Sequence, residues 1–181
     1  MEPASTLAPA TILAFNLSGT NPAAAAFIRA EARARDAMCS VISETKFAGA
    51  PAARDLAAAV GGRIFYQDAP VNEAHATTQY GVAILVHSDT ADIEEVGAHS
   101  DGFIALSVAL PGARPFLLIG AYLPPATSPV KERRQSVLTY VSELITREAH
   151  KYSTVVLAGD LNAQIGGLNG RRHSALPAAR R

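Results

Sequence analysis

Short apolar runs alternate along the chain with longer segments of helical periodicity. Between the runs at 103–110 and 116–122, a Pro111-Gly112 pair predicts the turn of an antiparallel hairpin. Alternation of this kind is typical of a single mixed α/β domain. The runs that we predict to be strands occupy residues 11–17, 39–44, 63–67, 81–87, 103–110, 116–122 and 154–159. We expect the strand at 154–159 to be buried.

Helical patterns fill three of the intervals between these runs. Pro22 suits the first position of an Ala-rich helix that extends to about residue 37, and a second helix over 51–60 ends at a Gly-Gly pair. The strongest helix begins near Pro129, where Ser128 can cap it. Its apolar stripe consists of Val130, Val137, Leu138, Val141, Leu144 and Ile145.

The two ends of the chain lack these patterns. We expect residues 1–10 to be disordered, residues 11–168 to form the domain, and residues 169–181 to form a basic, disordered tail. The N-terminus has no basic segment before an apolar run, and the most apolar run, 116–123, is too short to cross a bilayer. The sequence therefore predicts a soluble intracellular protein, nuclear or cytoplasmic, without membrane association.

Composition narrows the functional classes. The 181 residues carry a formal net charge of +0, which excludes a strongly basic protein that coats nucleic acid by bulk electrostatics. A single cysteine, Cys39, excludes both an intramolecular disulfide framework and a cysteine-based zinc cluster.

Polar residues close or interrupt several of the apolar runs, where strands deliver side chains to a common rim: Asn16, Glu44, Tyr122, Asp160 and Asn162. Glu44 follows Val-Ile-Ser and is suited to a hard cation such as Mg²⁺. On an extended segment Asp160 and Asn162 would point the same way, so that they could orient a water and hold a phosphate oxygen. The Tyr122 hydroxyl could stabilise charge that develops on a transferring phosphoryl group.

Each of these residues also has a purely structural interpretation. Asn16 and Asp160 can be turn residues, and Tyr122 can anchor the end of its strand. Glu44 can form a weak surface ion pair with Lys46. Taken singly, the residues leave both interpretations open.

Their order along the chain and their neighbours carry more information. The segments in question are Ile12-Leu-Ala-Phe-Asn16, Val41-Ile-Ser-Glu44-Thr45-Lys46, Tyr80-Gly81-Val-Ala-Ile-Leu, Tyr122-Leu-Pro-Pro and Gly159-Asp160-Leu161-Asn162-Ala163. In these motifs the sequence resembles the endonuclease/exonuclease/phosphatase superfamily of abasic-site endonucleases and deoxyribonuclease I-like enzymes. Within this superfamily the motifs are most similar to those of the non-LTR retroelement endonucleases. The resemblance implies a four-layered α/β sandwich of two mixed β-sheets flanked by helices, lacking the last strands.

The resemblance also implies a reaction, the Mg²⁺-dependent hydrolysis of a phosphodiester with DNA as substrate, for which Mn²⁺ is a possible replacement ion. Glu44 and Asn16 are the implied metal ligands, and Asn16 is also counted among the catalytic residues. Tyr122 and Asn162 are implied to donate to phosphate oxygens, while Asp160 aligns the attacking water. For the DNA backbone we consider a local basic rim at Arg133-Arg134 or Arg171-Arg172, although a solvated helix face is the favoured interpretation of the first pair.

One part of the family pattern is missing from the sequence. The superfamily continues to an Asp-His pair that activates the water, and this sequence contains no Asp-His dipeptide. His87-Ser88-Asp89 and His99-Ser100-Asp101 are interpreted as loop or strand-end residues. We therefore expect an incomplete domain whose activity is lower by a factor of about a hundred to ten thousand. The alternatives are a phosphatase acting on a phosphoinositide or other phosphoester, and a noncatalytic fragment or degenerate copy.

Overall fold

The computed structural model describes residues 10–47, 49–67, 71–72, 77–78, 80–99, 102–125 and 131–162. The N-terminus and the basic tail that we expect to be disordered lie outside these residues, apart from residue 10.

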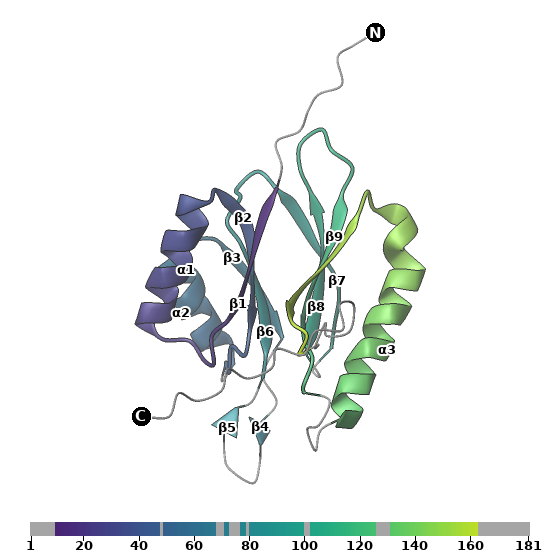
Figure 1. The fold of residues 1–181 in the computed structure, drawn as a ribbon. Helices are drawn as coiled ribbons and strands as arrows, with labels where there is room; N and C mark the ends of the chain where they lie inside the picture. Colours follow the sequence, from purple (N-terminus) through teal and green to yellow (C-terminus); the bar gives the residue numbers. More distant parts are fainter. Residues whose placement is uncertain are drawn as a thin grey trace, which may run out of the picture.

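Two four-stranded sheets pack face to face in the described part of the chain (Figure 1). In each sheet one outer pair of strands is parallel and the remaining pairs are antiparallel, so both sheets are mixed as expected. The first sheet has the order β1 (Thr11–Asn16), β2 (Ala37–Ser43), β6 (Val82–Val86) and β3 (Arg63–Gln67). The second has the order β10 (Val155–Asp160), β9 (Phe116–Tyr122), β8 (Phe103–Ala109) and β7 (Asp92–His99).

Helices cover both outer faces and complete the four layers (Figure 1). Helices α1 (Pro22–Ala34) and α2 (Ala50–Val60) lie on the first sheet, and α3 (Lys131–Glu148) lies on the second and ends in a 3₁₀ turn (Ala149–Lys151). A short hairpin, β4 (Val71–Asn72) and β5 (Thr77–Thr78), projects from one end. No helix in the described ranges combines the length and the apolar character that a membrane crossing requires.

The hydrophobic residues form three clusters, one between the sheets and one beneath the helices on each side. Strands β2 and β9 are buried at every position because each lies between a helix layer and the opposite sheet, which explains their continuous apolar runs. Gly120 of β9 faces the first sheet. A Cβ added there would lie 3.1–3.2 Å from side-chain carbons of Val41, Val82 and Ile84.

Strand β7 is absent from the strands that the apolar pattern predicts. It is one of the two edge strands of the second sheet in the described part, and its exposed acidic residues Asp92, Glu94 and Glu95 interrupt the apolar positions. The pairing with β8 also shifts register between Glu95 and Gly97. A bulge of this kind breaks the two-residue alternation by which a half-buried strand is recognised.

Three other expectations need correction. Helix α1 ends at Ala34 rather than near residue 37, because Asp36 adopts φ 48° and β2 begins at the next residue. The run at 154–159 is not a fully buried strand, since β10 lies at a sheet edge and Leu157 is 40% exposed. Leu138 is 37% exposed on α3 and does not belong to its buried stripe.

Candidate active site

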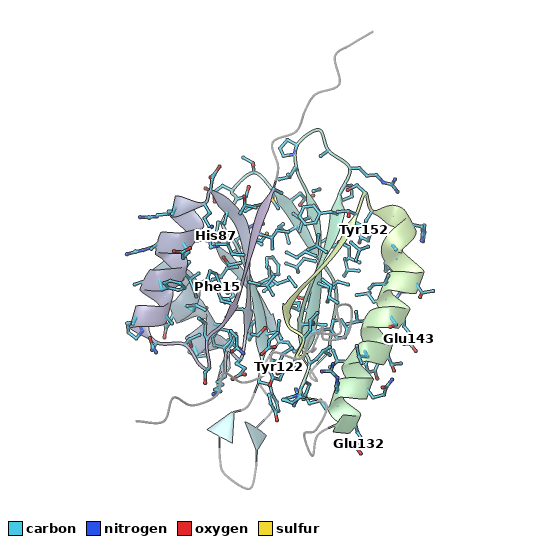
Figure 2. The ribbon with its side chains drawn as sticks, viewed as in Figure 1. Phe15, His87, Tyr122, Glu132, Glu143 and Tyr152 are labelled. Atoms are coloured by element: carbon cyan, nitrogen blue, oxygen red, sulfur yellow. The ribbon has the colours of Figure 1, made fainter. Side chains whose placement is uncertain are left out.

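The polar strand ends singled out in the sequence meet at one end of the sandwich. Strands β1 and β2 are parallel, as are β9 and β10, so the carboxyl ends of each pair lie at the same edge of its sheet. Figure 2 labels Tyr122 at this end, next to the β4–β5 hairpin, and His87 toward the opposite end. The two sheets therefore each contribute two strand ends to one site.

Asn16, Glu44 and Asp160 come together there. The Asn16 Nδ2 atom donates to Glu44 Oε1 at 3.2 Å and to Asp160 Oδ2 at 2.6 Å. Glu44 follows β2 in the first sheet, whereas Asp160 ends β10 in the second. Two carboxylates from different sheets thus converge on one amide group, as the sequence motifs predict.

The backbone around these residues is unusually strained. Each residue in the left-handed region costs on the order of 1–2 kcal/mol, so it persists only where the surroundings hold it. Of the six non-glycine residues with positive φ in the described ranges, all but Asp36 lie in the segments that form this end of the sandwich. These five are Ser18, Glu44, Lys46, Tyr80 and Asn162.

Lys46 reaches back across Glu44. Its Nζ donates to the carbonyl oxygen of Ser18 at 3.3 Å and to the Ser18 hydroxyl at 3.1 Å, and it lies 3.9 Å from Glu44 Oε2. The ion pair is long and partly exposed, so it contributes little stability. It does place one positive charge beside the Glu44 carboxylate.

Tyr122 is a proton donor at neutral pH. Its residue is only 4% exposed, and burial raises the pKa of its phenol to about 12, with further contributions from Glu44, Tyr80 and Asp160. A hydrogen bond from the Asn162 side chain partly offsets this rise in the Tyr122 pKa. The phenol therefore keeps its proton well above neutral pH.

The segment after Asp160 is a turn rather than an extension of the strand. The Asn162 amide N–H donates to Asp160 Oδ1 at 3.0 Å, and Asn162 has φ 40°. The turn interpretation of Asp160 is thus confirmed, and Asn16 makes a similar contact, since its Oδ1 accepts from the Ser18 amide at 3.3 Å. The premise that Asp160 and Asn162 point the same way on an extended segment is wrong, because Asn162 Nδ2 turns back to the Leu123 carbonyl at 3.0 Å.

Ser43 and Arg134 hold the site together, and sequence analysis does not single out Ser43 for any role. The Ser43 Oγ accepts the Asp160 amide N–H at 2.9 Å and so joins the two sheets. Its signal in the sequence is a polar residue on the inward side of an apolar run, after Cys39 and Val41. Arg134 donates to the carbonyls of Pro124 at 2.8 Å and Leu161 at 3.0 Å, so it is neither a free basic rim nor a solvated helix face.

The sequence profile of the endonuclease/exonuclease/phosphatase family matches residues 13–181. The chain belongs to this family. Members of the endonuclease/exonuclease/phosphatase family are hydrolases of phosphoester bonds and generally use divalent metal ions. No curated protein matches the sequence significantly.

Solved structures of other proteins have the same fold. The chain is similar to the AP endonuclease LMAP from Leishmania major, with a TM-score of 0.61 and 16% identity over 84% of this chain and 55% of that one. It is similar to the 3′ phosphatase NExo from Neisseria bound to product DNA hairpin, with a TM-score of 0.57 and 17% identity over 83% and 57% of the two chains. It is similar to TDP2 from Caenorhabditis elegans, with a TM-score of 0.54 and 19% identity over 86% of this chain and 48% of that one. The chain thus spans about half the length of these structures.

The donor set fits the divalent ion that this family generally uses. Hard cations such as Mg²⁺ and Mn²⁺ prefer carboxylate and amide oxygens over sulfur. Within the described ranges, no three residues among His, Cys, Asp and Glu form a cluster able to hold a metal by themselves. Two carboxylates do converge at Asn16, and its partly positive amino group lies where a cation would balance their charge. Glu44, Asp160 and Asn16 are therefore compatible with a hard divalent ion that also keeps water or phosphate ligands.

Proposed function

We propose that the chain binds Mg²⁺ and a phosphodiester at the ends of β1, β2, β9 and β10 and acts as a DNA endonuclease of repair or retroelement type. The observation that carries the proposal is the convergence of Glu44 and Asp160 on Asn16 across the two sheets. DNA is favoured as substrate because similar solved structures include an AP endonuclease and a phosphatase bound to a DNA hairpin.

We assign the residues as follows. Glu44 would hold Mg²⁺ or Mn²⁺, joined by Asn16 once its side chain turns Oδ1, which accepts the Ser18 amide N–H, toward the ion. The ion, when bound, would polarise the phosphate and stabilise its developing charge. Tyr122 donates its phenolic proton in a hydrogen bond to a phosphate oxygen, because its pKa of about 12 keeps the phenol neutral. Asp160 accepts a hydrogen bond from the attacking water and orients it. Asn162, whose side chain bonds the Leu123 carbonyl and the Tyr122 phenol, supports the Tyr122 hydroxyl at the phosphate.

A plasmid-nicking assay tests this assignment. Supercoiled DNA is incubated with the chain and Mg²⁺, and relaxed circles are counted for the wild type, for Glu44→Gln and for Glu143→Gln as the matched control. Glu143 is an exposed acid on α3, well away from Tyr122 in Figure 2. Because metal charge stabilisation is worth several kcal/mol, Glu44→Gln should lower the nicking rate at least about a hundredfold. Glu143→Gln should leave it unchanged, and chelation should abolish it.

A second measurement separates metal binding from catalysis. Mg²⁺ or Mn²⁺ at a hundred times its dissociation constant stabilises the folded state by about 2.7 kcal/mol, so the melting temperature should rise in the wild type and in Glu143→Gln but not in Glu44→Gln. Nicking that survives Glu44→Gln would contradict the assignment. A metal-dependent melting shift without nicking would remove the DNA endonuclease proposal, and release of phosphate from an inositol phosphate would then identify a phosphatase.

A further inference from the structure

Tyr80 has a strained backbone conformation two residues before β6 begins. Its φ is 73°, a conformation that bulky residues rarely adopt, and Gly81 beside it has φ 86°. Strain of this kind persists where several contacts fix it, and it is concentrated at functional sites. The contacts of Tyr80 therefore indicate what its conformation serves.

Both the ring and the backbone of Tyr80 contact the candidate site. Its ring stacks on Tyr122 with centroids 5.0 Å apart and planes inclined by 25°. The Arg133 guanidinium carbon lies 4.7 Å from the Tyr80 ring centroid. The Tyr80 carbonyl oxygen accepts the Lys46 amide N–H at 3.0 Å, two residues beyond Glu44. Tyr80 thus joins β9, α3 and the loop after β2.

We infer that Tyr80 is a positioning residue: its ring, contacted by the Arg133 guanidinium, holds the Tyr122 phenol in the orientation that meets the phosphate. The inference deepens the proposed function and rests on it in one respect, namely that the group met by the Tyr122 hydroxyl is a phosphate. An offset stack fixes the plane of a neighbouring ring, and a cation near the ring strengthens the arrangement. Nothing in the assignment gives Tyr80 a direct contact with the substrate.

The orientation of Tyr122 needs such support. Tyr122 is the last residue of β9, where the strand gives way to the Leu123-Pro124 segment. A hydroxyl that donates to a phosphate oxygen must lie within about 3 Å of it, and a misplacement of about 1 Å costs on the order of a hundredfold in rate. A second aromatic ring against the Tyr122 ring restricts the rotations that would displace the hydroxyl.

NMR tests the positioning without any requirement for activity. In wild-type protein with labelled tyrosines, we expect NOEs between the Tyr80 and Tyr122 rings and ring-current shifts of the Tyr122 signals. Tyr80→Phe should preserve the Tyr122 shifts, and Tyr80→Leu should move them toward those of an unstacked ring. Tyr140→Leu, a matched change at a residue 42% exposed on α3, should leave them in place.

Nicking kinetics then test whether the position matters to the reaction. We expect Tyr80→Leu to lower kcat about tenfold to a hundredfold with KM changed less than about threefold, and Tyr80→Phe to restore kcat, because the ring and not its hydroxyl does the positioning. Absence of the wild-type NOEs, or Tyr122 signals that do not move in Tyr80→Leu, overturns the inference even if Tyr80→Leu folds poorly. Moved Tyr122 signals with an unchanged kcat overturn its catalytic part. If the wild type shows no nicking, the proposed function fails while the NMR result still decides whether Tyr80 positions Tyr122.

Discussion

Removal of one buried oxygen atom, in Ser43→Ala, tests whether the two halves of the site are held together as the structure implies. Ser43 is 0% exposed, and its Oγ accepts the Asp160 amide N–H at 2.9 Å. The substitution removes this acceptor and leaves the strand pairing of β2 unchanged. Its effect should therefore concentrate at Asp160.

The size of the effect follows from the partner that remains. A buried N–H deprived of its acceptor costs about 1–3 kcal/mol, and we take about 2 kcal/mol for Ser43→Ala. For a chain of this length that corresponds to a fall in melting temperature of about 4–8 °C. If the loss is local, the Asp160 amide should exchange its hydrogen about thirtyfold faster, because 1.36 kcal/mol is a factor of ten.

Ser40→Ala is the matched control. Ser40 lies on the same strand, is also 0% exposed, and bonds His87 Nε2 at 2.8 Å through its Oγ. The half-buried His87 ring can turn to water, so we expect a smaller loss of about 1 kcal/mol and no change at Asp160. Thermal unfolding followed by circular dichroism and amide exchange followed by NMR measure the two effects. Equal exchange of the Asp160 amide in wild type and Ser43→Ala would refute the reasoning.

Two further predictions concern the backbone and pH. In Gly159→Ala the new Cβ would overlap the Ala121 carbonyl oxygen at φ 129°, so chemical unfolding should show a loss of at least about 3 kcal/mol in the free energy of unfolding. Gly112→Ala, at φ 75° and with open space around it, should lose about 1–2 kcal/mol, and equal losses would contradict the steric argument. Burial lowers the pKa of His87 from its ordinary 6.5, despite the opposing hydrogen bond to the Gly61 carbonyl. Near this pKa the unfolded chain therefore binds more protons at His87 than the folded chain does. The stability contributed by neutral His87 is lost as pH falls below about 6.5. His87→Gln should flatten this part of the stability profile, and an unchanged slope between pH 7.5 and 5 would contradict it.

The sequence predicts the interior of the fold better than its edges. Continuous apolar runs mark β2 and β9 because these strands are buried on both faces. An edge strand such as β7 mixes exposed acids with a bulge, and neither follows a simple period. The end of α1 is missed for a different reason: Asp36, and not a glycine, takes the left-handed position after the helix, so the usual stop signal is absent.

For the site, the sequence identifies the residues that converge but not those that hold them. Asn16, Glu44 and Asp160 stand at strand ends within recognisable motifs, so their meeting follows from the resemblance. The supporting contacts of Tyr80 and Arg134 link segments far apart in the chain and depend on φ angles and helix placement, which leave no local pattern. Asn162 shows the same limit. Its two-residue spacing from Asp160 suggests that both side chains point the same way, but the left-handed turn at Asn162 directs its side chain to the Leu123 carbonyl.

Because the two carboxylates belong to different sheets, the geometry of the site depends on how the sheets sit against each other. Strands β1 and β10, which carry Asn16 and Asp160, are edge strands in the described part, while Gly120 in the middle of β9 packs against side chains of the first sheet. Protein interiors are packed densely enough to transmit small shifts, so a change in sheet separation at Gly120 moves Asp160 relative to Glu44. The Ser43 bond and the two hydrogen bonds of Asn16 restrain this distance at the site itself. Core residues between the sheets thus set the carboxylate spacing, and with it the fit of the divalent ion that we propose, without contacting the site.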